Sequence, residues 1–204
     1  MTRPADVTFA PLDLDGLATA EGVVACMVPE GGTLDTGARR LNRLSKGAVK
    51  RAVDSPAFEK LSAGEILEIG FPTGMAATAI ALVRLDRRPH RMKALAAGAA
   101  LAKLRGSRAL TLLGGGSKRL TDIVLGAALR GYDFSDHKTG DDTPSVAAID
   151  VRVTKPEEAE TAFVAARAQA DGVFFTRDLV NEPSNVLTTT EFATRLEALR
   201  DHGV

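Results

Sequence analysis

A continuous apolar run at residues 22–28 most constrains what this chain can fold into. It reads Gly-Val-Val-Ala-Cys-Met-Val and is followed by Pro29, Gly31 and Gly32. A strand that is apolar on both faces has to be covered on both faces, as in a sheet that lies between two layers of helices. Further apolar segments predict strands at residues 7–10, 64–69, 77–83, 108–113 and 146–153.

Helical patterns separate most of these strands. Asp35 or Thr36 would cap the first helix, and only a short turn around Pro72 and Gly74 separates the third and fourth strands, which a hairpin joins most simply. The alternation of strands and helices predicts an α/β sandwich with a mixed sheet. We expect its helices at residues 37–53, 89–105 and 120–130.

A long helix is expected after the last strand. Thr154 would cap it, with Pro156 in the first turn and Glu157 at capping-box spacing. Pro183 ends it, because proline has no N–H donor and restricts the residue before it. Its length of about 27 residues exceeds the average helix of about 11–12 residues and suits a spacer that joins two domains.

The chain then begins another helix, at residues 189–201. Thr188 and Glu191 have the spacing of a capping box for its start. Nothing in this sequence follows to cover its apolar face, so we expect the chain to break off as a second domain begins. That face consists of Phe192, Leu196 and Leu199.

The joint between these two helices resembles a known family. The run at residues 177–188, Arg-Asp-Leu-Val-Asn-Glu-Pro-Ser-Asn-Val-Leu-Thr, is similar to the segment of leucyl aminopeptidases (cytosol aminopeptidases, a metallopeptidase family) that links the N-terminal domain to the catalytic domain. Residues 131–139 resemble a family stretch in which a helix ends at a Tyr-x-Phe-x-x-x-Lys run. The resemblance implies a macro-domain-like N-terminal domain, a linker helix and the first elements of a truncated catalytic domain. These would span residues 1–153, 154–182 and 183–204.

The same resemblance implies what the parent protein does. Its relatives remove N-terminal residues from peptides with two divalent metal ions, commonly zinc or manganese, and assemble as cytoplasmic hexamers. In the family the metal ligands and an Asn-Thr-Asp-Ala-Glu-Gly-Arg run lie beyond the joint, and this sequence contains no such run. We therefore expect a non-catalytic domain with no catalytic, metal-binding or cofactor-binding residues, inactive alone. It would contact its own catalytic domain and other subunits and shape access to the active site.

Residues that could bind metal are isolated in the sequence. The paired aspartates at 133 and 136 and at 141 and 142 are interpreted as solvated loop carboxylates, and residues 135–145 predict a mobile loop. His90, His137 and His202 show no zinc spacing. The single Cys26 excludes an internal disulfide and is interpreted as a small buried hydrophobe.

A glycine-rich run at residues 114–117 keeps a second function open. It follows a predicted strand and precedes a predicted helix, where backbone N–H groups can approach a phosphate. Macro domains bind ADP-ribose with glycine-rich loops. The run has neither a Gly-x-Gly-x-x-Gly pattern nor a P-loop lysine, so a flexible turn into a capped helix is the simpler interpretation.

Basic residues are concentrated in the middle of the chain. Residues 37–105 contain fourteen basic and five acidic residues. Such a surface attracts DNA through its phosphates, and the resemblance adds that some bacterial members of the family bind DNA. A solvated helix face or a subunit contact is the simpler interpretation. The two basic groups are Arg39, Arg40, Arg43, Lys46, Lys50 and Arg51, and Arg84, Arg87, Arg88, Arg91 and Lys93.

Two readings of the function therefore remain. The first is the N-terminal domain of a leucyl aminopeptidase, and the alternative is a free-standing macro-like module that binds a nucleotide of the ADP-ribose type or DNA. The start of the chain has no apolar signal region, and no window approaches 18 uninterrupted apolar residues. We therefore expect a cytoplasmic protein without a membrane contact.

Overall fold

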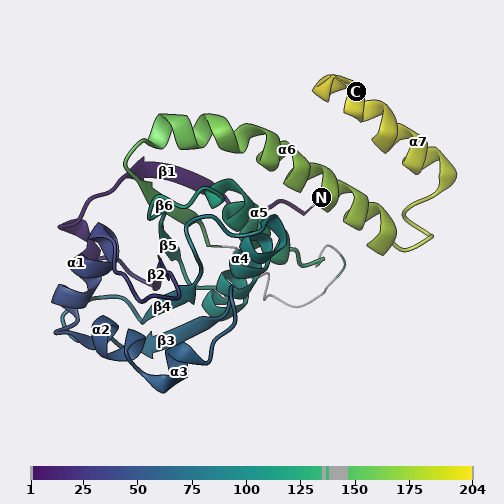
Figure 1. Cartoon of the computed structure of the whole chain (residues 1–204). Coiled ribbons are helices and arrows are strands. Elements are labelled where there is room, and N and C mark those ends of the chain that lie inside the picture. The colour runs from purple at the N-terminus through teal and green to yellow at the C-terminus, as the bar shows by residue number, and fades with distance from the viewer. Residues whose placement is uncertain (1, 135–136, 138–146, 204) are drawn as a thin grey trace.

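The computed structural model describes residues 2–134, 137 and 147–203, and in this part of the chain six strands form one mixed sheet. The strand order is β1-β6-β5-β2-β4-β3, and β3 alone is antiparallel to its neighbour (Figure 1). The predicted mixed sheet and the hairpin between its third and fourth strands are both confirmed. The strands are β1 (Val7–Pro11), β2 (Val23–Val28), β3 (Ile66–Gly70), β4 (Ala79–Arg84), β5 (Leu110–Leu113) and β6 (Ile149–Val153).

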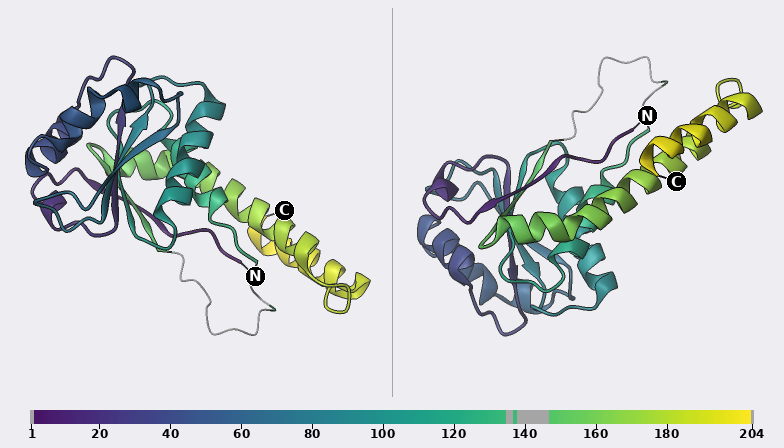
Figure 2. Two further views of the ribbon diagram at one scale, coloured as in Figure 1. Left: turned by 90° about the horizontal axis from the view of Figure 1, so that it is seen from below. Right: turned by 90° about the horizontal axis from the view of Figure 1, so that it is seen from above.

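Helices cover both faces of this sheet (Figure 2). One face is covered by α1 (Thr36–Leu44), α2 (Ala48–Val53) and α3 (Pro56–Glu59). The other is covered by α4 (Arg91–Arg105), α5 (Leu120–Arg130) and α6 (Pro156–Asn181). The remaining elements are α7 (Thr189–Glu197) and the short 3-10 helices η1 (Gly16–Ala18) and η2 (Ala198–His202).

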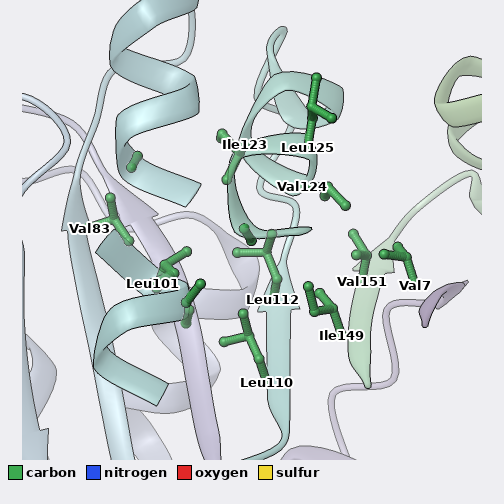
Figure 3. Close-up of a cluster of buried hydrophobic side chains, with 14 of the residues drawn as sticks. Val7, Val83, Leu101, Leu110, Leu112, Ile123, Val124, Leu125, Ile149 and Val151 are labelled. Atoms are coloured by element: carbon green, nitrogen blue, oxygen red, sulfur yellow. The ribbon is translucent and has the colours of Figure 1, made fainter. Parts of the chain in front are cut away.

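Residues 23–28 of the apolar run form the central strand β2, and every residue of this strand is buried. Val23, Ala25 and Met27 face the core under α4, α5 and α6, part of which is drawn in Figure 3. Val24, Cys26 and Val28 face the second core, under α1 to α3. The prediction that this strand is covered on both faces is confirmed.

The helix predicted at residues 37–53 is wrong as a single element. The backbone turns left-handed at Lys46 (φ 50°) and Gly47 (φ 85°), which ends α1 and lets α2 start in a new direction. Of the two residues expected to cap this helix, Asp35 is the N-cap of α1. Its side chain accepts from the Ala38 N–H at 2.8 Å. The third short helix was not predicted, although Ser55 and the proline after it form a standard helix start.

The long helix α6 has the predicted proline at its start, but Thr154 does not cap it. The N-cap position falls on Lys155, and no side chain there accepts a backbone hydrogen bond. The helix after the joint ends at Glu197 and passes into η2, so its last turn is tighter than expected. The predicted mobile loop at residues 135–145 lies outside the described residues, apart from His137. Among the described residues, no helix is both long and apolar enough to cross a membrane.

Two glycines bring α4 and α5 into close contact. A Cβ atom on Gly98 would lie 1.8 Å from the Ile123 carbonyl oxygen, and one on Gly126 would lie 2.1 Å from the Leu95 carbonyl oxygen. Neither distance is possible without a backbone shift. The conformational cost of glycine inside these helices is therefore offset by close helix packing.

This contact yields a stability prediction. Gly98→Ala should lower the free energy of unfolding by about 1–3 kcal/mol, because the added methyl group overpacks a backbone contact. The matched variant Gly172→Ala, in α6, meets nothing within 4 Å and should raise it by about 0.5–1 kcal/mol. Urea unfolding of both variants tests the pair, and a stabilised Gly98→Ala would contradict the packing described here.

Candidate functional site

The buried carboxylate of Asp178 lies in the last turns of α6 and joins three separate parts of the chain. Its side chain accepts from the Thr2 backbone N–H at 2.7 Å, from the Thr2 Oγ1 hydroxyl at 2.6 Å and from the Tyr132 hydroxyl at 3.0 Å. The residue is only 1% exposed. Because a buried carboxylate needs donors for its oxygens, the end of α6 is held against both the start of the chain and the segment after α5.

Tyr132 is the second centre of this contact. Its ring meets Phe174 edge to face, with centroids 5.1 Å apart, and carries the Arg177 guanidinium 3.8 Å above its centroid. Asn181 donates to the Tyr132 hydroxyl at 3.0 Å. Burial and the hydrogen bond to Asp178 raise the pKa of Tyr132, so the phenol stays protonated and can donate.

Glu182 extends the contact to the next helix. Its Oε2 lies 2.8 Å from His137 Nε2, and its Oε1 accepts from Arg195 Nη1 of α7 at 3.3 Å. Arg195 also donates from Nε to Glu191 at 2.7 Å. The hydrogen bond from His137, followed by that from Arg195, holds the pKa of Glu182 below its usual value.

Backbone hydrogen bonds close the turn between the helices. The Val186 and Leu187 N–H groups both donate to the Pro183 carbonyl at 2.9 Å. The Thr188 hydroxyl accepts from the Glu191 N–H at 3.2 Å, which confirms the predicted cap of α7. No described residue of α7 is buried, and its apolar side chains Phe192 and Leu196 are 43% and 41% exposed.

The glycine-rich run lies at a cavity of about 590 Å³ beyond the carboxyl ends of β5 and β6. The starts of α1, α5 and α6 also line this cavity. Gly115 and Gly116 are left-handed, and the Asp35 carboxylate comes so close that a Cβ atom on Gly115 would lie 2.5 Å from its Oδ2. An anion that entered here would meet this carboxylate. The helix that follows has no side-chain cap, contrary to the expected capped turn.

The two basic groups are partly neutralised within the domain. In the first, Arg40 pairs with Asp15 at 3.1 Å and Lys50 pairs with Asp54 at 2.5 Å, and the break at Gly47 divides the expected single face. In the second, Arg84 pairs with Glu30 at 2.7 Å and donates to the Leu61 carbonyl. Arg87 donates to the Gly116 carbonyl, and Arg91 pairs with Asp122 at 3.1 Å.

The candidate metal ligands that are described have other surroundings. Cys26 is fully buried in β2, where burial raises its thiol pKa. His90 caps α4, and His137 belongs to the contact with Glu182. Asp136, Asp141 and Asp142 are outside the described residues. Within residues 2–134, 137 and 147–203, no three His, Cys, Asp or Glu side chains are grouped to hold a metal ion, so these residues do not fit a metal centre.

Several curated proteins similar to this chain are named probable cytosol aminopeptidase. The chain is 51% identical to a probable cytosol aminopeptidase of Dinoroseobacter shibae and 42% identical to another of Cereibacter sphaeroides. Both alignments cover the whole chain and 42% of the relative. The chain therefore spans about two fifths of the length of the curated relatives it matches. No protein-family model matches it.

Solved structures show the same fold. A mutant of tomato leucine aminopeptidase matches with a TM-score of 0.74 at 16% identity, over 99% of this chain and 44% of that one. The macro domain of ganglioside induced differentiation associated protein 2 matches with a TM-score of 0.56 at 12% identity, over 80% of this chain and 84% of that one. The predicted macro-domain-like fold is thereby confirmed. Over its whole length this chain matches cytosol aminopeptidases, and it corresponds to the N-terminal domain of that family.

Proposed function

We propose that this chain is a non-catalytic domain that orients and assembles a cytosol aminopeptidase, a metallopeptidase that removes N-terminal residues from peptides. The observation that carries the proposal is the polar contact around Asp178 and Glu182, which joins the body, α6 and α7. A long helix fixed at its far end holds whatever follows it in one direction. We divide the chain into a body at residues 1–153, a linker helix at residues 154–182 and the start of the catalytic domain at residues 183–204.

The hydrolytic chemistry belongs, in this proposal, to the part of the parent protein that this chain does not contain. Two divalent metal ions, zinc or manganese, would activate water there. The described residues of this chain do not group around a metal. What the chain contributes is orientation of that part, contacts with neighbouring subunits of a hexamer, and the shape of the approach to the active site. The name of the relatives also supports a cytoplasmic location.

The macro-like alternative has less support. Its glycine-rich cavity has the Asp35 carboxylate beside the loop, which opposes a phosphate. The basic groups on which the DNA alternative rested are partly paired with acidic side chains. The full-length similarity to aminopeptidases supports the first reading.

The proposal predicts that this chain alone has no peptidase activity. Incubation with a leucyl-amide substrate and Mn²⁺ should give no release above a no-protein blank, because the described residues supply no group of side chains for the metal ions. Reproducible cleavage that a chelator abolishes would contradict the non-catalytic assignment. A full-length relative assayed in parallel serves as the positive control.

The contact around Asp178 predicts that exchanging one carboxylate oxygen for an amide nitrogen has a large effect on stability. Asp178→Asn should lower the free energy of unfolding by about 2–3 kcal/mol, because charged hydrogen bonds are lost and an amide N–H group is placed against donors. Asp171→Asn on the exposed side of the same helix should change it by less than about 0.5 kcal/mol. Urea unfolding compares the two, and equal effects would argue against the contact as a fixed joint.

The contact around Glu182 predicts a pH dependence. The folded-state pKa of Glu182 lies below its unfolded value, so its stabilising contribution is complete above about pH 4.3, the ordinary Glu pKa. The contribution is lost as the pH falls through the folded-state pKa. Hydrogen exchange of the α7 amides should therefore be faster in Glu182→Gln than in wild type at pH 7, and the difference should vanish in acid. Glu197→Gln, at an exposed position, is the matched control. A pH-independent difference would contradict the role of the Glu182 carboxylate in holding α7.

A further inference from the structure

The two edges of the sheet differ in how they are covered. Figure 1 shows β1 and β3 at opposite edges, with α6 beside β1. At the β1 edge, the Val7 carbonyl accepts from Arg167 Nη2 of α6 at 3.0 Å. That edge therefore has a helix and an arginine against it.

The β3 edge is open in the described structure. The Glu65 carbonyl accepts from the Arg84 N–H at 2.9 Å, and the Phe71 N–H donates to the Thr78 carbonyl at 2.8 Å. Odd-numbered residues of β3 thus face β4, and in an antiparallel pair the even-numbered residues face away. The backbone groups of residues 66, 68 and 70 point outward, and no hydrogen bond to them is found among the described residues.

Natural proteins usually block such an edge with charges, proline or a bulge, because unpaired backbone groups attract another strand. β3 reads Ile-Leu-Glu-Ile-Gly and has one charge, on Glu68, while Ile66, Leu67 and Ile69 are half-buried. At the end of the strand Phe71 is 85% exposed and has a left-handed backbone, with φ 47°. A bulky side chain rarely adopts this conformation. A strained and exposed aromatic residue beside an open edge indicates a surface for a partner.

We propose that the β3 edge is a two-fold contact with a second copy of this chain. This inference rests on the proposed role in subunit assembly and names the surface that performs it. With the axis at Glu68, an antiparallel pair places residue 66 opposite residue 70 of the partner, and every outward N–H meets an outward carbonyl. The same register places the half-buried Leu67 opposite Ile69 of the partner, so that apolar side chains meet.

The charges at the axis fit this arrangement. Two Glu68 carboxylates would come together there, and like charges that face each other are destabilising. In each copy, however, Arg108 Nη1 lies 3.8 Å from Glu68 Oε1. The axis therefore brings together two carboxylates and two guanidinium groups, which leaves no net charge.

The position of the edge favours another copy over the continuation of the same chain. The joint after α6 and the helix α7 project beyond the far end of α6, away from β3 (Figure 1). An unrelated extended peptide can also bond to the outward backbone groups of β3. It does not, however, place apolar side chains opposite Leu67 and Ile69 and a glutamate opposite Glu68, as a second copy does. Binding of such a peptide without self-association is one outcome of the test below.

The first experiment is disulfide cross-linking. Cys26 is the one native cysteine and is fully buried, so an introduced thiol reacts alone. In the proposed register, the Cα atoms of two residues at position 68 are about 5.5 Å apart, within the disulfide range of about 4.4–6.8 Å. Mild oxidation of Glu68→Cys should therefore give a covalent dimer. Lys103→Cys, on the exposed side of α4, should stay monomeric on the same gel.

The second experiment blocks hydrogen bonding at the β3 edge and needs no introduced thiol. Glu68→Pro deletes an outward N–H and leaves the bonds to β4 in place, whereas Glu68→Thr keeps that N–H. Sedimentation should show self-association of wild type and Glu68→Thr, and its loss in Glu68→Pro. Phe71→Ala should weaken it about tenfold. Circular dichroism confirms that each variant is folded.

Two outcomes would overturn the proposal. One is a monomeric wild type that gives no cross-link at position 68, including one that binds only an added extended peptide. The other is unchanged association in a folded Glu68→Pro. Either result leaves the inactivity of the chain and the effect of Asp178→Asn unaffected, so failure of this contact is distinguishable from failure of the proposed function.

Discussion

The structure depends on a strand that has no polar face. Because every side chain of β2 is buried, the chain must supply one helical layer for Val23, Ala25 and Met27 and another for Val24, Cys26 and Val28. The neighbours of β2 on both sides, β4 and β5, run parallel to it. This is expected, because parallel strands occur in sheets that helices cover on both faces. Within one helical layer, small residues set the distance between α4 and α5, as the contact between Gly98 and the Ile123 carbonyl shows. The absence of tryptophan fits a core built from alanine, valine and leucine.

Patterns within a short stretch of sequence predicted most elements of this fold. The strand at residues 22–28, the hairpin, the helix at residues 120–130 and the cap at Thr188 depend on residues within a few positions of one another. The break near Gly47 was missed because the apolar pattern continues through it, while only the left-handed backbone turns the helix. Thr154 was misassigned because a threonine three residues before a glutamate is a common pattern that α6 does not use.

The site was predictable only in part. The motif at residues 177–188 indicated a joint, and residues 131–139 matched a second family stretch. Neither pattern indicates that Tyr132 donates to Asp178, and nothing local marks Thr2, which lies 176 positions from its partner. The match between such distant residues is set by how α5 and α6 pack, so it requires the folded structure.

The use of a buried carboxylate at the joint has a physical reason. An apolar contact there would stabilise α6 against the body, but it would tolerate rotation or sliding, because the hydrophobic effect has no direction. Asp178 with its donors from Thr2 and Tyr132 accepts only one arrangement, since any shift leaves a buried charge without hydrogen bonds. Glu182 applies the same constraint one turn later, to His137 and Arg195. Asp178 thus fixes the end of α6 against the body and Glu182 fixes α7 against α6, and in the proposed division of the chain this orientation is what the linker helix provides.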